Sequence, residues 1–189
     1  SQAAESAALE FAPYSLKNTA TYPNKTVVET EDFFYSTDTV TRKVTANSTG
    51  SFVVGGKIAD GATATYDEKD GPIYVDGANG VNYAVRLTKK DNVQFFATEE
   101  DMLGGKNALE SISGYWTTEV SDLNVGDSAY FAVSASTSKK AAELYDNAKS
   151  GSSTAKAKKR LKNLPQEWTD YISSHGDVDK YIKNIPSGK

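Results

Sequence analysis

Apolar and polar side chains alternate with a period of two between residues 26 and 135. The pattern is clearest in residues 81–88, where Val81, Tyr83, Val85 and Leu87 are expected to point inward, and residues 39–46 repeat it. Such alternation is typical of antiparallel strands that bury one face. Further strands are predicted at 27–30, 33–36, 51–54, 73–76 and 92–98. Turn-forming pairs separate them at 55–56, 60–61, 70–72, 76–77 and 79–80. Many short strands with frequent turns predict a sandwich or a barrel.

The period changes after residue 135. Helices are predicted at 139–149 and 154–163, a third begins at Pro165, and a short one follows from Asp177. A single helical turn is predicted between Thr98 and Gly105, because a capping residue opens it and glycines close it. The fold class is therefore α+β: mainly an antiparallel β-sandwich, jelly-roll or Ig-like, with a C-terminal cluster of short helices. The predicted divisions are an extended N-terminal arm at 1–25, the sandwich at 26–135 and a helical appendage at 136–189.

The stretch from Tyr115 to residue 135 contains four rings whose sides can be predicted. Trp116 and Phe131 share their faces with apolar neighbours and are expected in the core. Tyr115 and Tyr130 alternate with polar residues and are expected outside. Residues 122–127 are expected to join the two strands as a hairpin. Two outer-face tyrosines with polar groups nearby would suit a sugar, since flat rings stack on its C–H surfaces.

The composition of the chain excludes several kinds of chemical site. The 189-residue chain has no cysteine, which excludes disulfides, thiolate metal sites and cysteine nucleophiles. No apolar run is long enough to span a bilayer, and no targeting segment is expected. Residues 136–163 hold eight cations and two anions, a net +6, so a total of −4 leaves −10 for the rest. A basic segment on an acidic body fits either a polyanion or another copy of the chain.

A metal site, a catalytic histidine and a nucleic-acid site are not predicted. Asp67, Glu68 and Asp70, with Asp76 beyond them, lack EF-hand spacing, so no metal is predicted. His175 is the single histidine and precedes a helix-ending glycine, where its charge would complement the helix dipole rather than serve a catalytic triad. Nucleic acid is not expected as a partner, because no aromatic residue interrupts the C-terminal lysines and the sequence pI is about 5.1.

The first functional hypothesis is a structural, non-enzymatic subunit of a filament, virion exterior or other extracellular surface, with no cofactor. Its partners are copies of itself or other subunits, and the N-terminal arm adds a strand to a neighbour. The residues expected to carry assembly are Leu9, Phe11, Tyr14, Lys156, Lys159, Arg160 and Trp168. The alternative is a carbohydrate-binding module that recognises a polysaccharide, with a site at Tyr115, Tyr130, Asn124 and Lys43. An enzyme acting on polysaccharides is a third hypothesis without a specific residue pair.

Overall fold

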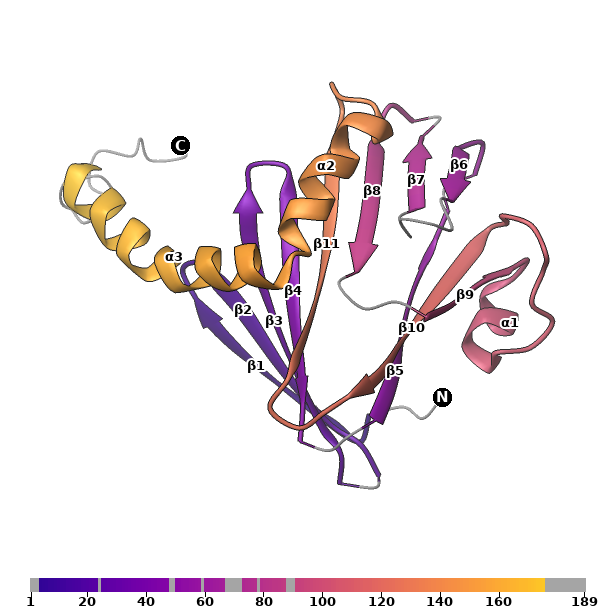
Figure 1. Ribbon diagram of the computed structural model, residues 1–189, viewed down its shortest axis with the longest axis horizontal. Coiled ribbons are helices and arrows are strands. Elements are labelled where there is room, and N and C mark those ends of the chain that lie inside the picture. Colours follow the sequence, from indigo (N-terminus) through magenta and orange to yellow (C-terminus); the bar gives the residue numbers. More distant parts are fainter. Residues whose placement is uncertain are drawn as a thin grey trace, which may run out of the picture.

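The structure is a computed structural model that describes residues 4–23, 25–47, 50–58, 60–66, 73–77, 79–87 and 91–175. Two antiparallel sheets form the sandwich (Figure 1). The large sheet has eight strands in the order β1 (Ser6–Ala12), β2 (Ser15–Thr21), β3 (Val27–Ser36), β4 (Thr39–Ala46), β11 (Ser128–Ser136), β8 (Asn82–Leu87), β7 (Ile73–Asp76) and β6 (Thr63–Tyr66). The small sheet has three, in the order β5 (Gly50–Lys57), β10 (Tyr115–Leu123) and β9 (Asp91–Phe96).

The prediction of an antiparallel, sandwich-like fold with C-terminal helices is confirmed. Strands β4 and β7 have the predicted bounds, and the segments 27–30 and 33–36 join as one strand, β3. Helix α1 (Glu99–Gly104) is also where the sequence places it. Thr98 Oγ1 accepts a hydrogen bond from the Asp101 amide, and Gly105 ends the helix at a φ of 64°. Only residues that tolerate positive φ suit that position, so local sequence decides this element.

The main core lies between the two sheets. The small sheet contributes Phe95 and Trp116, while the large sheet contributes Val75, Val85 and Ala129. All five side chains are almost fully buried. Trp116 is therefore inside as predicted, and Phe131 packs against the same cluster while half-buried.

Two helices lie on the opposite, outer face of the large sheet, over part of its width (Figure 1). In α2 (Ala141–Gly151), Leu144 and Ala148 pack on Ala84 of β8. In α3 (Thr154–His175), Ala157 and Leu164 pack on β3 and β11. The molecule thus has three layers, and the central sheet is buried on both faces where the helices and the small sheet overlap.

The prediction for Tyr130 is wrong, because a helix covers its face of the sheet. This residue was expected outside, yet it is 1% exposed and packs with Phe33 and Leu164. Burial raises the pKa of its phenol. Alternation along β11 marks two faces but does not say which is covered, and here α3 covers the face with tyrosine and serine.

Three further expectations differ from the structure. Residues of the predicted arm form a hairpin, β1–β2, that extends the sheet of their own chain through β3. Strands β10 and β11 are not a hairpin, because they belong to different sheets and the segment between them crosses the sandwich. The helices expected on either side of Pro165 are one helix, α3. The helix expected after Asp177 lies outside the described residues.

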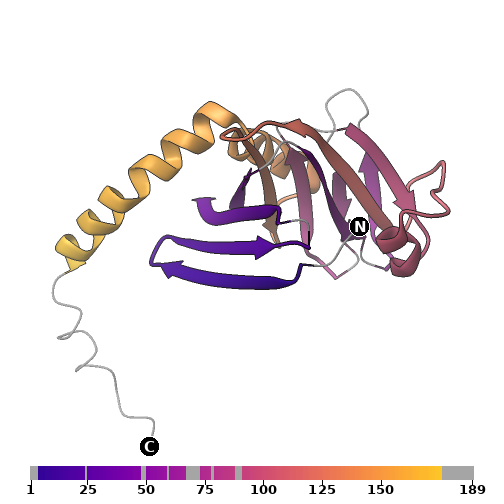
Figure 2. The same ribbon diagram turned by 90° about the horizontal axis from the view of Figure 1, so that it is seen from below.

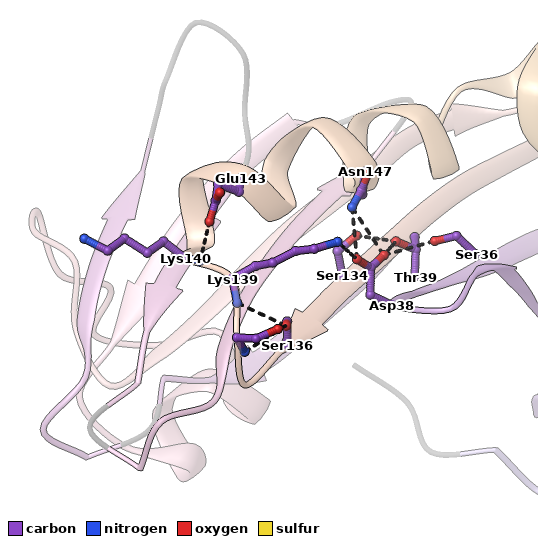
Figure 3. Close-up of polar contacts among 10 residues, drawn as sticks. Ser36, Asp38, Thr39, Ser134, Ser136, Lys139, Lys140, Glu143 and Asn147 are labelled. Carbon is purple, nitrogen blue, oxygen red and sulfur yellow. Dashed lines mark hydrogen bonds and ion pairs between the residues drawn. The ribbon is translucent and has the colours of Figure 1, made fainter.

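A polar cluster holds α2 to the turn between β3 and β4 (Figure 3). The Asp38 carboxylate accepts hydrogen bonds from Lys139 Nζ at 2.8 Å, from Thr39 Oγ1 at 2.8 Å and from Asn147 Nδ2 at 3.1 Å. Its side chain is only 14% exposed. The Lys139 hydrogen bond holds the pKa of Asp38 below its ordinary value, with help from Thr39 and Ser36 and against the effect of burial.

The substitution Asp38→Asn should lower the free energy of unfolding by about 1–3 kcal/mol near neutral pH, because charged hydrogen bonds are lost at a largely buried site. The carboxylate stabilises the fold above its unfolded-state pKa, and this contribution is lost as the pH falls through the lower folded-state pKa. The stability difference between wild type and variant should therefore shrink in acid. Urea unfolding of both proteins at a series of pH values measures it; a difference that does not change with pH would contradict the role given to the charge.

Candidate functional site

The inner face of the large sheet is covered over only part of its width. Its contributors to the inter-sheet core come from β6, β7, β8 and β11. Strands β1, β2 and β3 extend beyond the small sheet, as Figure 2 shows from below. In the part of the chain that the structure describes, no second sheet therefore lies over the inner face of these strands.

Strand register identifies the side chains on this uncovered region. Phe34 pairs with Val40, which pairs with Val133, which in turn pairs with the core residue Val85. Cross-strand partners point to the same side of a sheet. By the same reasoning Leu9 and Phe11 align, through β2, β3 and β4, with Ala129 and Phe131 of the inner face.

These apolar side chains are exposed. We call the set Leu9, Phe11, Phe34, Val40 and Val133 the open face. Their exposed fractions are 60%, 77%, 63%, 40% and 37% respectively. Isolated exposed apolar residues are ordinary, but these five lie on the same face of one sheet, on β1, β3, β4 and β11, and exposed apolar groups gathered on one face mark interaction sites.

An ion pair lies among them. Arg42 donates from Nε to Asp32 Oδ1 at 2.6 Å and from a second nitrogen to Oδ2 at 2.8 Å, and its guanidinium lies 5.5 Å from the Phe131 ring centroid. The hydrogen bonds that Arg42 donates to Asp32 raise the pKa of Arg42, so its guanidinium stays charged. Because both charges are already matched in two-point geometry, the pair can be covered by a partner at lower cost than a lone charge.

Comparisons with known proteins bear on the fold. No family model matches the sequence, and no curated protein matches it. Among solved structures, a family GH92 inverting mannosidase from Bacteroides thetaiotaomicron aligns over 86% of this chain with a TM-score of 0.56 and 11% identity. A heparan sulfate lyase, HepC, from Pedobacter heparinus aligns over 73% with a TM-score of 0.45 and 15% identity. The chain spans 22% of the length of each. The likeness to the mannosidase is one of fold.

The predicted apolar assembly residues lie in three places. Leu9 and Phe11 belong to the open face, while Tyr14 packs against the cluster beneath α3. Trp168 is 38% exposed on the far part of α3, stacked on Tyr171 at 5.8 Å between ring centroids. These placements bring Leu9 and Phe11 together on one strand and leave Trp168 on a different surface.

The predicted basic residues lie along α3. Lys156 and Lys159 are exposed. Arg160 is engaged within the chain, because it pairs with Glu167 and donates from Nε to the Phe34 carbonyl at 3.3 Å. Arg160 therefore fastens α3 to β3.

The residues predicted for sugar binding do not converge. Tyr115 begins β10 and Asn124 follows its end, a separation of roughly 30 Å along an extended strand. Lys43 pairs with Tyr130 on the helix-covered face of the large sheet. Since Tyr130 is buried there, the expected platform of two outer tyrosines is wrong. Tyr115 is half-buried, with Lys57 Nζ at 5.9 Å from its ring centroid.

Sequence reasoning missed Phe34, Val40 and Val133 as surface residues. A signal was present at Phe33 and Phe34: two adjacent aromatic residues in one strand must point to opposite faces. Phe33 is buried under α3 and Phe34 is open. Both faces of β3 therefore carry a large apolar side chain, although only one is covered.

The remaining candidate residues are the single histidine and the acidic residues near β7. His175 ends α3, stacks on Tyr171 and contacts Ser174 Oγ at 3.0 Å through Nδ1. Across the described ranges, no cluster of three or more histidine and acidic side chains could hold a metal ion, and no helix is long and apolar enough to cross a membrane. The acidic loop at 67–71 lies outside those ranges. Asp76 accepts a hydrogen bond from the Ala141 amide at 3.0 Å, which anchors the start of α2.

Proposed function

We propose that the chain is a non-enzymatic structural subunit that assembles with a second copy of itself through strand β1 and the open face. The observation that carries this proposal is the contrast within one sheet surface. One part of the inner face of the large sheet is buried against Trp116 and Phe95. On the same face, Leu9 and Phe11 of β1 are 60% and 77% exposed. Burying such apolar area is the main favourable term in protein association.

The position of β1 favours a second copy as the occupant. This strand is an edge of the large sheet, so one of its sides has no strand partner among the described residues. A symmetric antiparallel pairing centred on Leu9 would place Leu9 against Leu9 and Phe11 against Ala7 of the second copy, all on the inner face. It would also set each Glu10 opposite an alanine rather than another Glu10. A pair of this kind is the self-complementary contact that two-fold symmetry requires.

A β1 contact alone closes a dimer, so a filament or a particle surface needs a second contact. The charge distribution supplies a candidate. Lys156 and Lys159 are exposed on α3, whereas the chain outside residues 136–163 is strongly acidic. Opposite charges on different parts of one subunit attract copies head to tail. An extracellular or virion-surface location is part of the same proposal.

Sedimentation equilibrium of the wild-type chain tests self-assembly. We expect the weight-average mass to rise with concentration from one chain toward two, and toward larger species at low salt. Raising the ionic strength should remove the larger species first, because surface charge contacts are screened. A mass equal to one chain at every concentration and salt would contradict the proposal.

A second candidate is a carbohydrate-binding module of a larger carbohydrate-active protein. The fold likeness to part of a mannosidase supports it. Its most suitable residue here is Tyr115, whose half-buried ring lies beside Lys57. Migration of the chain in gels containing polysaccharides should then be retarded, and Tyr115→Ala should abolish the retardation. Tyr171→Ala is the matched control, since Tyr171 is an exposed aromatic residue on another surface. Unretarded wild-type migration on all polysaccharides would count against this candidate.

A further inference from the structure

A second surface feature lies away from the open face, where α2 turns into α3. A cavity of about 570 Å³ is formed there between the two helices and strand β8. Three cationic residues line it: Arg86 from the sheet, Lys149 from α2 and Lys156 from α3. Two of them, Lys149 and Lys156, belong to the basic segment at 136–163.

Arg86 gives the cavity its sheet-side wall. It lies on β8 opposite Ala132 of β11, on the face that the helices cover. Its Nε atom is buried without a hydrogen-bond partner, and none of the four ion pairs among the described residues includes it. A buried donor of a charged group destabilises the fold when it has no acceptor. An acceptor from outside the described residues would satisfy it.

The rest of the lining is suited to an oxyanion. Ser150, Ser153 and Thr154 add hydroxyl groups that can donate hydrogen bonds. The cavity also has one acidic side chain, Asp146, which is exposed and is not ion-paired to Arg86. Among the described residues, three cations and one anion line the cavity, a net charge of +2.

We propose that this cavity binds a phosphate or sulfate group, held by the guanidinium of Arg86 and the ammonium groups of Lys149 and Lys156. The planar guanidinium matches the tetrahedral oxygens in two-point geometry, and the lysines supply point charges. The net charge of the lining balances that of a dianion. The site is independent of the open face, so its occupation does not require assembly.

Titration of isotope-labelled protein with inorganic phosphate, inorganic sulfate and a sulfated disaccharide tests the proposal by NMR. The Arg86 Nε–Hε resonance should shift and saturate, with a dissociation constant of about 1 mM or lower for at least one probe. A much lower constant for the disaccharide identifies a sugar sulfate as the source of the group, while equal constants identify the free ion.

Variants separate a site from general electrostatic attraction. Lys149→Gln and Lys156→Gln should each weaken binding about 3- to 10-fold, as expected for one lost charge-assisted contact. Asp146→Asn should strengthen it. Lys158→Gln is the matched control, because Lys158 is an exposed lysine on α3 that does not line the cavity. A non-saturating Arg86 shift, or an equal loss in Lys158→Gln and Lys156→Gln, would overturn the proposal.

Discussion

Phe11→Asp is expected to convert the self-associated protein to single chains at concentrations where the wild type is paired. Phe11 is the most exposed large apolar side chain of the open face, at 77%. In the proposed dimer it lies across from Ala7 of the second copy, so an aspartate there would replace an apolar cross-strand contact with a charge at both ends of the pairing. Two such contacts are lost in the symmetric dimer, about 0.5–2 kcal/mol in total, or roughly 2- to 30-fold in the dissociation constant.

Val53→Asp provides the control for this prediction. Val53 is exposed to a similar extent, 61%, but belongs to β5 of the small sheet. The Val53→Asp substitution also places a charge on an exposed strand, but it does not change the open face. Equal association in wild type and Phe11→Asp, or equal weakening in the two variants, would show that the open face is not the interface.

Gly151→Ala should destabilise the fold strongly. A Cβ at this position would lie 2.9 Å from Thr39 Cγ2, 3.0 Å from Ala132 Cβ and 3.0 Å from Thr41 Oγ1. A hydrogen bond also joins Gly151 to the sheet, because Thr41 Oγ1 donates to the Gly151 carbonyl at 2.7 Å. The end of α2 must lift from the sheet to admit the methyl group, and overpacking of this kind costs about 1–3 kcal/mol. Urea unfolding measures it.

Gly104→Ala is the matched control for helix propensity. Gly104 also ends a helix, and a Cβ there would meet only the Lys106 side chain at 3.9 Å. Its effect should be neutral or stabilising by up to about 1 kcal/mol. A similar small effect at Gly151 would mean that α2 does not pack on β4 and β11 as closely as described.

The elements predicted from sequence are those that local chemistry decides. Strand β7 and helix α1 were placed by turn residues and caps a few positions away. Trp116 was placed inside because its own strand carries the apolar alternation. In each case the information lies within about ten residues of the element, which is why it can be read from the pattern.

The elements that were predicted wrongly depend on distant contacts. Tyr130 is inside because Leu164, more than thirty positions later, packs on it. Helix α3 continues through Pro165 because Leu164 is anchored in the same cluster while Pro165 itself is exposed. The carbonyl that loses its hydrogen bond to a proline can then be hydrated. No local pattern carries that information.

The candidate site was predicted in part for the same reason. Leu9 and Phe11 stood out as apolar residues in a polar segment, and the structure places both on the open face. Their expected setting, an extended arm, is replaced by an edge strand within the sheet. Arg86 could not be assigned to a cavity, because its surroundings come from helices over fifty positions away.

Amide hydrogen exchange at low and high protein concentration tests whether two copies of the chain pair through β1. If two copies pair through β1, the amides of Ser6–Ala12 that point away from β2 should gain protection as concentration rises. Strand β6, the opposite edge of the same sheet, should exchange at the same rate in both conditions. We expect concentration-dependent protection that is confined to β1 and the open face. Association accompanied by unchanged exchange in β1, or by protection at β6, would contradict it.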